Sequence, residues 1–328
     1  IQICGLPFFA ANDDEWWRFP QDSAKNIPDY VWETSKASSG ARLRFRTDSS
    51  RLALRMEWIS IAENDNLHRY GAAGLDAYVD GEYLRTVVPP SLVVHELDLF
   101  SGVTKKERDI CLYLPLFSVV KVIGLGINEG SNLASPEPFT LPDPVVFYGT
   151  SITHGGCAAR PGLSYPAIAC RDLNLDFVNF GLNGCGRGEA EVAKILARVK
   201  AACFVLDYSQ NNPSAESLKN NYAPFIRILR KAQPEVPIIC VTPIYWTPEL
   251  SGTEGPSIHE GLRQVIRDAV SALRGEGIED LFLVEGNRDM LSPEKGDGLT
   301  DGLHPNSLGF HYMARGISKH LSEILFEE

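Results

Sequence analysis

The chain has 328 residues, of which 44% are hydrophobic and 22% are charged, and its formal net charge is −11 at pH 7. This composition excludes a disordered, collagen-like or coiled-coil chain, and the length predicts roughly two domains. No apolar run approaches the roughly 20 residues that span a bilayer. An acidic chain is a poor partner for nucleic acid, whose phosphates need clustered Lys and Arg. We therefore expect a soluble protein that binds neither membrane nor nucleic acid.

Two-residue alternation of apolar and polar side chains, the pattern of half-buried strands, runs through residues 41–127. Residues 48–50 and the pair Asp80-Gly81 each separate two such runs and predict hairpin turns. No helical period appears in this half. The pattern predicts a β-sandwich, similar to a jelly roll, over residues 1–140. We expect this domain to take part in substrate recognition, as a carbohydrate-binding domain does.

Residues 128–143 are rich in Ser, Pro, Asn and Glu and are predicted to be a linker. After them, short apolar runs alternate with segments of helical period. Buried strands that alternate with helices predict a parallel sheet covered on both faces. Residues 144–328 should therefore form a three-layer α/β/α domain of flavodoxin-like type. Ligands of such sheets bind at the carboxyl ends of the strands.

Ser151 directly follows the first strand predicted in this half. There it would present a hydroxyl and a backbone N–H beside a helix N-terminus, which suits an oxyanion. The alternative is a helix N-cap, a position that Ser and Thr also favour. The nucleophile turn of the α/β-hydrolase fold needs Gly where this chain has Thr153, which disfavours that fold.

Asp301 and His304 lie three residues apart, just before the last predicted helix. A carboxylate in this position can accept from one ring nitrogen and leave the other free as a base. The alternative is an Asp cap beside a surface His. Two segments with glycine and amide side chains, residues 179–184 and 207–212, end the second and third strands, at the same edge of the sheet as Ser151.

Together these four segments resemble, in order, the four sequence blocks of the SGNH hydrolases, the GDSL esterase/lipase superfamily. The resemblance covers about residues 145–325, and residues 148–162 are similar to a subgroup that carries an N-terminal β-sandwich. Two blocks depart from the family pattern, at Thr150, Ser209 and Asn212, in residues that the chemistry does not require. The blocks are Gly149-Thr150-Ser151-Ile152, Asn179-x-Gly181-x-Asn183-Gly184, Ser209-Gln210-Asn211-Asn212 and Asp301-x-x-His304.

The resemblance implies a serine esterase that needs no cofactor. Ser151 would be the nucleophile, His304 the general base and Asp301 the residue that orients the imidazole. The backbone N–H groups of Ser151 and Gly184 and the side-chain amide of Asn211 would form the oxyanion hole.

Three further residues are candidates for contact with the substrate, namely His154, Arg160 and Asn212. The alternative for His154 is the role of base in place of His304, and the alternative for Arg160 is stabilisation of its own loop. Asn212 competes with Asn211 for the amide role. No His, Cys or carboxylate cluster has the spacing of metal ligands, so no metal is expected.

The expected activity is removal of an acetyl or other short acyl group from a carbohydrate or a related small alcohol, by analogy with enzymes of the same architecture. One alternative is an acyltransferase of small-molecule biosynthesis that forms the same acyl-enzyme. Another is a non-catalytic carbohydrate-binding protein. Seven cysteines without a C-x-x-C pair suggest a reducing, cytoplasmic location, or a periplasmic or secreted one if a signal peptide was removed. Homo-oligomerisation stays open.

Overall fold

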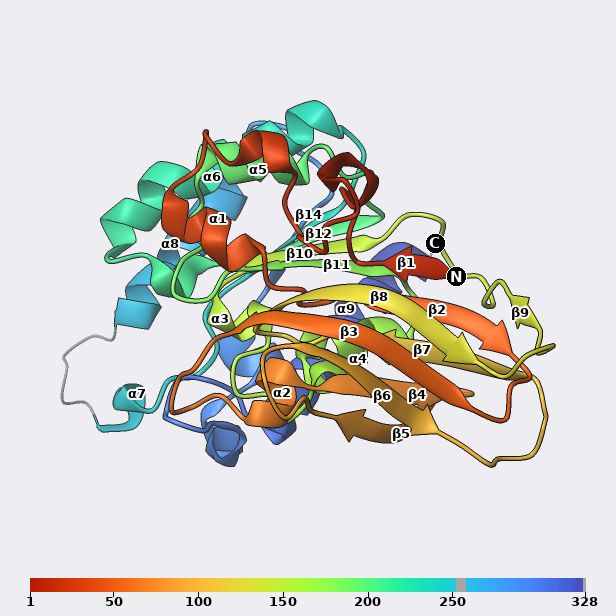
Figure 1. Cartoon of the computed structure of the whole chain (residues 1–328). Helices are drawn as coiled ribbons and strands as arrows, with labels where there is room; N and C mark the ends of the chain where they lie inside the picture. The colour runs from red at the N-terminus through yellow and green to blue at the C-terminus, as the bar shows by residue number, and fades with distance from the viewer. Residues whose placement is uncertain (252–257, 327–328) are drawn as a thin grey trace.

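The computed structural model describes residues 1–251 and 258–326, and it contains an antiparallel β-sandwich followed by a parallel sheet (Figure 1). The antiparallel strands end with β9 (Leu133–Ala134), and the parallel ones begin with β10 (Val145–Gly149). The predicted fold class, a sandwich followed by a three-layer α/β/α structure, is confirmed. No helix in the described residues is long and apolar enough to span a membrane.

Two antiparallel sheets pack face to face in the sandwich. The larger has the order β1-β2-β7-β4-β5 with β9 beside β2, and the smaller has the order β6-β3-β8. Apolar side chains of both sheets, among them Phe45, Leu54 and Trp58, share one core. The strands are β1 (Gln2–Cys4), β2 (Arg42–Thr47), β3 (Leu52–Ile61), β4 (Leu75–Val79), β5 (Glu82–Val87), β6 (Val94–Phe100), β7 (Arg108–Tyr113) and β8 (Ser118–Ile127).

The hairpin predicted at residues 48–50 is wrong. β2 pairs with β1, β7 and β9, whereas β3 pairs with β6 and β8, so these residues cross from one sheet to the other. Alternation shows which face of a strand is apolar but not which strand lies beside it. The hairpin at Asp80-Gly81 is confirmed, because β4 pairs with β5. Asp80 and Gly81 have φ angles of 52° and 82°, both positive as a type I′ turn requires.

The parallel sheet has the order β11-β10-β12-β13-β14. Helices α5, α6 and α8 cover one face, and α4 and α9 cover the other (Figure 1). The strand order reverses beside β10, and ligands of open parallel sheets bind at such a point. The elements are β11 (Phe177–Gly181), β12 (Cys203–Asp207), β13 (Ile238–Val241), β14 (Leu281–Val284), α3 (Ser151–His154), α4 (Tyr165–Asp172), α5 (Ala190–Leu196), α6 (Ala215–Ala232), α7 (Pro248–Ser251), α8 (Ile258–Gly275) and α9 (Ser307–Phe326).

Two short helices in the first half, α1 (Asp29–Ser35) and α2 (Arg69–Ala73), were not predicted. They have seven and five residues, too few to show a helical period. The segment around α1 leaves the sandwich and lies over the parallel sheet, on the side of α5 and α6 (Figure 1). There Phe19 packs edge-on against Phe180 of β11, with ring centroids 5.2 Å apart.

Arg18 joins this N-terminal segment to the parallel sheet. Its side chain has no exposed surface, and it donates hydrogen bonds to the carbonyl oxygens of Asn179 and Gly181 at the end of β11. The same guanidinium donates to the carbonyls of Thr34 and Ala37. A buried cation is tolerated when its donors are satisfied in this way.

The polar face of β2 is buried between the two halves as well. Arg42 and Arg44 alternate with the residues of the sandwich core, yet they are only 2% and 6% exposed. Arg42 forms an ion pair with Asp176, just before β11, and its guanidinium lies 3.8 Å from the ring centroid of Phe177. The second half of the chain therefore covers a strand face that would otherwise be in water.

Replacing Arg18 with Met should lower the free energy of unfolding by about 3 kcal/mol or more, because each buried acceptor that loses its donor costs about 1–3 kcal/mol. Urea denaturation followed by tryptophan fluorescence measures this loss. Arg51→Met is the matched control, since it removes an exposed guanidinium that pairs with Glu96 and Asp98. It should cost at most about 1 kcal/mol. Equal losses in the two variants would contradict the role of Arg18.

Candidate active site

Side chains of two distant segments meet at the carboxyl edge of the parallel sheet. Ser151 begins α3, and the N-cap of this helix is Thr150, whose hydroxyl accepts the N–H of Ile152. The N-cap is therefore Thr150 and not Ser151, so the N-cap alternative for Ser151 is wrong. Ser151 Oγ lies 2.9 Å from His304 Nε2, and His304 Nδ1 lies 2.8 Å from Asp301 Oδ2.

These contacts give His304 a defined arrangement of donors and acceptors. An ionised carboxylate only accepts hydrogen bonds, so the proton between His304 and Asp301 belongs on Nδ1. Nε2 is then free to accept from the hydroxyl of Ser151. The three groups form one continuous hydrogen-bonded series, which we call the serine–histidine–aspartate series.

The carboxylate of Asp301 accepts four hydrogen bonds. Oδ1 accepts the backbone N–H groups of Leu303 and His304, and Oδ2 accepts His304 Nδ1 and, at 2.9 Å, the side-chain amide of Asn66. Partial burial raises the pKa of Asp301, but these donors outweigh it and hold the pKa well below its usual range. The carboxylate is therefore ionised at neutral pH.

Asn66 is a site residue that the sequence did not reveal. It lies in the sandwich half, between β3 and α2, and is separated from Asp301 by 235 positions. No motif surrounds it, so no sequence signal was available. Through this side chain the first half of the chain contributes directly to the site.

The loops beside Ser151 are held by Asn179, which lies in β11. Its Nδ2 donates to the carbonyl of Thr153 in α3, and its Oδ1 accepts the N–H of Gly181. A Cβ atom on Gly181 would lie 2.1 Å from the backbone nitrogen of His154, so glycine is required for this close approach. The helix that begins with Ser151 is thereby fixed against the end of the neighbouring strand.

The residues expected to bind an oxyanion lie in three separate segments, at the start of α3, after β11 and in the turn after β12. In the described part of the chain, no acceptor contacts the backbone N–H groups of Ser151 and Gly184. Gly184 has φ of +69°, which favours glycine, although a Cβ there would meet nothing within 4 Å. Asn211 donates one amide hydrogen to the carbonyl of Cys185, which follows Gly184, and its second amide hydrogen remains.

The imidazole of His154 does not lie in the site. It is 1% exposed and stacks on Phe117 with ring centroids 4.1 Å apart, while its Nε2 lies 2.7 Å from the carbonyl oxygen of Leu116. Burial lowers the pKa of His154 well below its usual value. A neutral, enclosed imidazole between the two halves argues against both the base role and contact with a substrate.

Arg160 connects the two halves rather than facing open solvent. It forms an ion pair with the fully buried Asp76 at 2.8 Å and donates to the hydroxyl of Tyr78 at 2.7 Å. Asp76 also accepts the N–H of Gly162 from the same loop. This geometry supports the loop-stabilising alternative over contact with a substrate.

The side chain of Asn212 is bound to α6. It is 3% exposed, and its Oδ1 accepts hydrogen bonds from Ser217 Oγ and Asn221 Nδ2. Asn211, whose amide lies beside Gly184 through Cys185, is therefore the better placed of the two for the oxyanion role.

Cys157 lies close to the series, although its distance in sequence from Asp301 and His304 did not predict this. Within the described residues, its Sγ, an Asp301 oxygen and a His304 nitrogen lie within 4.8 Å of one another. Such a set of ligand types can bind metal. Both ring nitrogens of His304 are, however, already hydrogen-bonded, Nδ1 to Asp301 Oδ2 and Nε2 to Ser151 Oγ. The donor set therefore fits a resident metal poorly.

A pocket of about 510 Å³ lies beside the series and has walls from both halves of the chain. Asn66 and Leu67 line it from the sandwich half, and Cys157, Thr300 and Ser307 line it from the second half. Clefts between domains are common ligand sites. Ser151, Asp301 and His304 do not line this pocket, which meets the series through Asn66 and Cys157.

The fold and the site together define a class: a flavodoxin-like sheet that presents a serine–histidine–aspartate series at its switch point, as serine hydrolases do. The chain belongs to the GDSL-like lipase/acylhydrolase family, whose model matches residues 142–322. Residues 3–133 match the model for the N-terminus of SGNH-hydrolase-type esterases. The family expected from the sequence is thus confirmed, and the protein is an esterase by class.

Several solved structures share this fold. A protein from Bacteroides ovatus that is assigned as a GDSL-like lipase is 28% identical to this chain, with a TM-score of 0.89 over 99% of this chain and 96% of that one. Salicylyl-acyltransferase SsfX3 of a tetracycline biosynthetic pathway is 24% identical, with a TM-score of 0.82 over 95% and 90%. A family two carbohydrate esterase from Clostridium thermocellum, solved with cellohexaose, is 17% identical, with a TM-score of 0.70 over 88% and 94%. No curated protein matches significantly.

Asn66→Ala should lower kcat for p-nitrophenyl acetate by about tenfold, because Asp301 loses one charge-assisted hydrogen bond. The rate at which a fluorophosphonate labels the protein should fall in parallel, since it reports the reactivity of the serine with little dependence on substrate binding. Asn64→Ala, in the same loop, is the matched control and should retain both rates. Unchanged rates in Asn66→Ala with an unaltered thermal midpoint would show that Asn66 does not position Asp301.

Proposed function

We propose that the protein is a serine esterase that removes a short acyl group, such as acetyl, from a carbohydrate or a related small alcohol. The observation that carries this proposal is the continuous series of hydrogen bonds from Ser151 through His304 to Asp301. The substrate class has separate support, because the carbohydrate esterase solved with cellohexaose has the same fold over most of both chains. Fold alone does not determine the substrate.

In the first half-reaction, Ser151 Oγ attacks the carbonyl carbon of the ester and gives its proton to His304 Nε2. The tetrahedral intermediate then collapses, the bond to the alcohol oxygen breaks, and His304 returns the proton to the departing alcohol. Asp301 holds Nδ1–H throughout and stabilises the positively charged imidazole. An acyl-enzyme on Ser151 remains.

In the second half-reaction, water attacks the acyl carbon while His304 takes one of its protons. The bond to Ser151 Oγ breaks, the proton passes to this oxygen, and the carboxylic acid leaves. In both steps the negative oxygen would be bound by the N–H groups of Ser151 and Gly184 and by the second amide hydrogen of Asn211. Loss of one such donor typically costs about 10²–10³ in rate.

The sandwich half is proposed to help bind the part of the substrate that is not transferred. Asn66 and Leu67, from that half, line the pocket beside the series. An acetyl group by itself would need far less room than the roughly 510 Å³ of this pocket. The space suits a sugar or another alcohol of similar size.

Acyl transfer is the second candidate, in which an alcohol replaces water in the second half-reaction. The specific observation that favours it is the likeness to the salicylyl-acyltransferase over 95% of this chain. The third alternative, a non-catalytic carbohydrate-binding protein, is disfavoured because the serine–histidine–aspartate series is complete.

Ser151→Ala should reduce ester turnover by about 10⁴-fold or more while leaving the unfolding transition intact, because removing one member of such a series removes most of its catalysis. His304→Ala should be nearly as damaging. His320→Ala, a partly exposed residue of α9, is the matched control. A fluorophosphonate should label Ser151 alone, as peptide mass analysis would show. Labelling at another residue, or retained activity in Ser151→Ala, would overturn the assignment.

The products of the reaction distinguish hydrolysis from acyl transfer. With p-nitrophenyl acetate as donor and cello-oligosaccharides or simple alcohols as acceptors, we expect acetate to exceed acetylated acceptor at every acceptor concentration. The reason is that a pocket open to solvent admits water at high concentration. Predominant acylation of an acceptor, measured by mass spectrometry, would establish the transferase instead. Saturable sugar binding without either product would establish the binding protein.

A further inference from the structure

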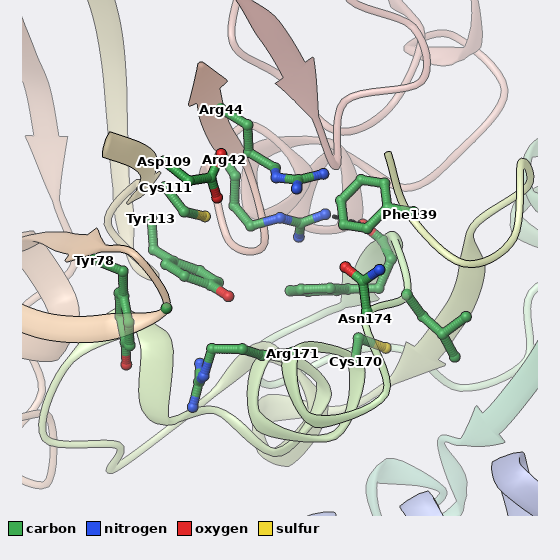
Figure 2. Close-up of a pocket in the computed structure, with 13 residues that line it drawn as sticks. Arg42, Arg44, Tyr78, Asp109, Cys111, Tyr113, Phe139, Cys170, Arg171 and Asn174 are labelled. Carbon is green, nitrogen blue, oxygen red and sulfur yellow. Dashed lines mark hydrogen bonds between the residues drawn. The ribbon is translucent and has the colours of Figure 1, made fainter. Parts of the chain in front are cut away.

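A second cavity, of about 170 Å³, is lined by residues from both halves of the chain (Figure 2). Phe177 lines it and begins β11, whereas Ser151 follows the other end of the neighbouring strand β10. Paired strands of five residues separate these ends by about 13 Å. The cavity therefore belongs to the amino edge of the sheet and is a separate site.

Arg44 carries an unused donor in this cavity. Its side chain is 6% exposed, and its Nη2 donates to the backbone carbonyl of Glu137 at 2.9 Å. Its Nη1 is buried, and no hydrogen-bond partner for it exists among the described residues. A buried, unsatisfied N–H of a charged group is costly, so this donor is available to an acceptor outside the protein chain, a water or a ligand.

Aromatic rings orient the guanidinium groups in the cavity. Arg44 lies 3.9 Å from the ring centroid of Phe139, and Arg42 lies 3.8 Å from that of Phe177. A stacked guanidinium uses its face for the ring and keeps its N–H edge for acceptors in its own plane. This arrangement suits a planar acceptor, and carboxylate is the planar anion that arginine binds best.

Two further groups from opposite walls favour an anion. Tyr113 extends its hydroxyl into the space below Arg42 (Figure 2). Arg171 of α4 lines the opposite wall, and because its Nη1 already donates to the carbonyl oxygens of Gly162 and Ala167, it contributes its positive charge. Burial raises the pKa of Tyr113 above its usual value, so the hydroxyl keeps its proton and can donate. The aromatic rings of Tyr78, Tyr113, Phe139 and Phe177 complete a largely apolar lining.

The opposing charge in the cavity is Asp109 of β7. Its Oδ1 is buried without a hydrogen-bond partner in the described residues, although the charge of Arg44 is close enough to interact with it. Asp176 already pairs with Arg42. Three arginines and one carboxylate, Asp109, line the cavity, so its lining carries a net positive charge.

We propose that this cavity binds a small carboxylate with a flat apolar body, which accepts from Arg44 Nη1 and lies between the aromatic rings. A volume of about 170 Å³ holds roughly five or six water molecules at about 30 Å³ each, so a small monocarboxylate fits and an oligosaccharide does not. Both halves of the chain line the cavity, so the ligand would also stabilise their contact.

Benzoate is the probe, in titration calorimetry and thermal unfolding of the full chain. We expect saturable binding of one benzoate and a rise in the unfolding midpoint. Arg44→Gln should weaken binding by about tenfold or more, because a charge-assisted hydrogen bond is lost. Asp109→Asn should strengthen it, since a competing negative charge is removed. Arg46→Gln, on the same strand and paired with Glu137 outside the cavity, is the matched control and should bind as the wild type does.

If Arg44→Gln unfolds, Arg44→Lys provides the same test, because it keeps the charge and loses the flat N–H edge. Acetate and inorganic phosphate are tested as comparison ligands in the same experiments. Acetate that binds as tightly as benzoate, or phosphate that binds in its place, would overturn the proposed ligand. If benzoate showed no saturable binding, or if Arg44→Gln left its binding unchanged, the proposed site would be wrong. Turnover of p-nitrophenyl acetate should stay constant in all these variants, which separates this site from the proposed esterase.

Discussion

The buried guanidinium of Arg18 holds the two halves of the molecule together at the point where the candidate site is built. It binds the carbonyls of Asn179 and Gly181 at the end of β11. Asn179 in turn binds the carbonyl of Thr153 in α3, the helix that begins with Ser151. A cation without contact to water must have its donors satisfied, so the backbone around it has little freedom. The placement of the nucleophile candidate therefore depends on a residue of the N-terminal segment.

A second carboxylate, that of Asp207, is buried at the same edge of the sheet and binds the residues around it. Asp207 ends β12 and accepts hydrogen bonds from Gln210, Tyr165 and Thr153. Burial raises its pKa to about 6, so at neutral pH an ionised group is held there by its donors. Asp301 shows the opposite balance, because its donors outweigh its burial. The environment of Asp207 suits a buried structural residue, and that of Asp301 suits an ionised partner for His304.

Local patterns predicted the parallel sheet because its strands are continuous apolar runs and its helices repeat at helical period. The contacts between halves had no local pattern. Alternation in β2 located Arg42 and Arg44 on one face, but only the packed second half shows that this face is buried. The candidates Ser151, His304 and Asp301 could be predicted because four segments occur in the order of the family's sequence blocks, whereas the position of each residue beside a strand or helix left a cap as the alternative. Asn66 could not be predicted, since its role exists only when a loop of the sandwich reaches Asp301.

In the proposed reaction, the partition between water and an acceptor alcohol would depend on more than the serine–histidine–aspartate series. Structures with this fold include an acyltransferase and a carbohydrate esterase, so the sheet alone permits both outcomes. Asn66 lines the pocket beside the series and also donates to Asp301. A bound alcohol that contacts this amide would act on the carboxylate through one hydrogen bond. Substrate binding by the sandwich half and the orientation of His304 would then be linked through a single side chain.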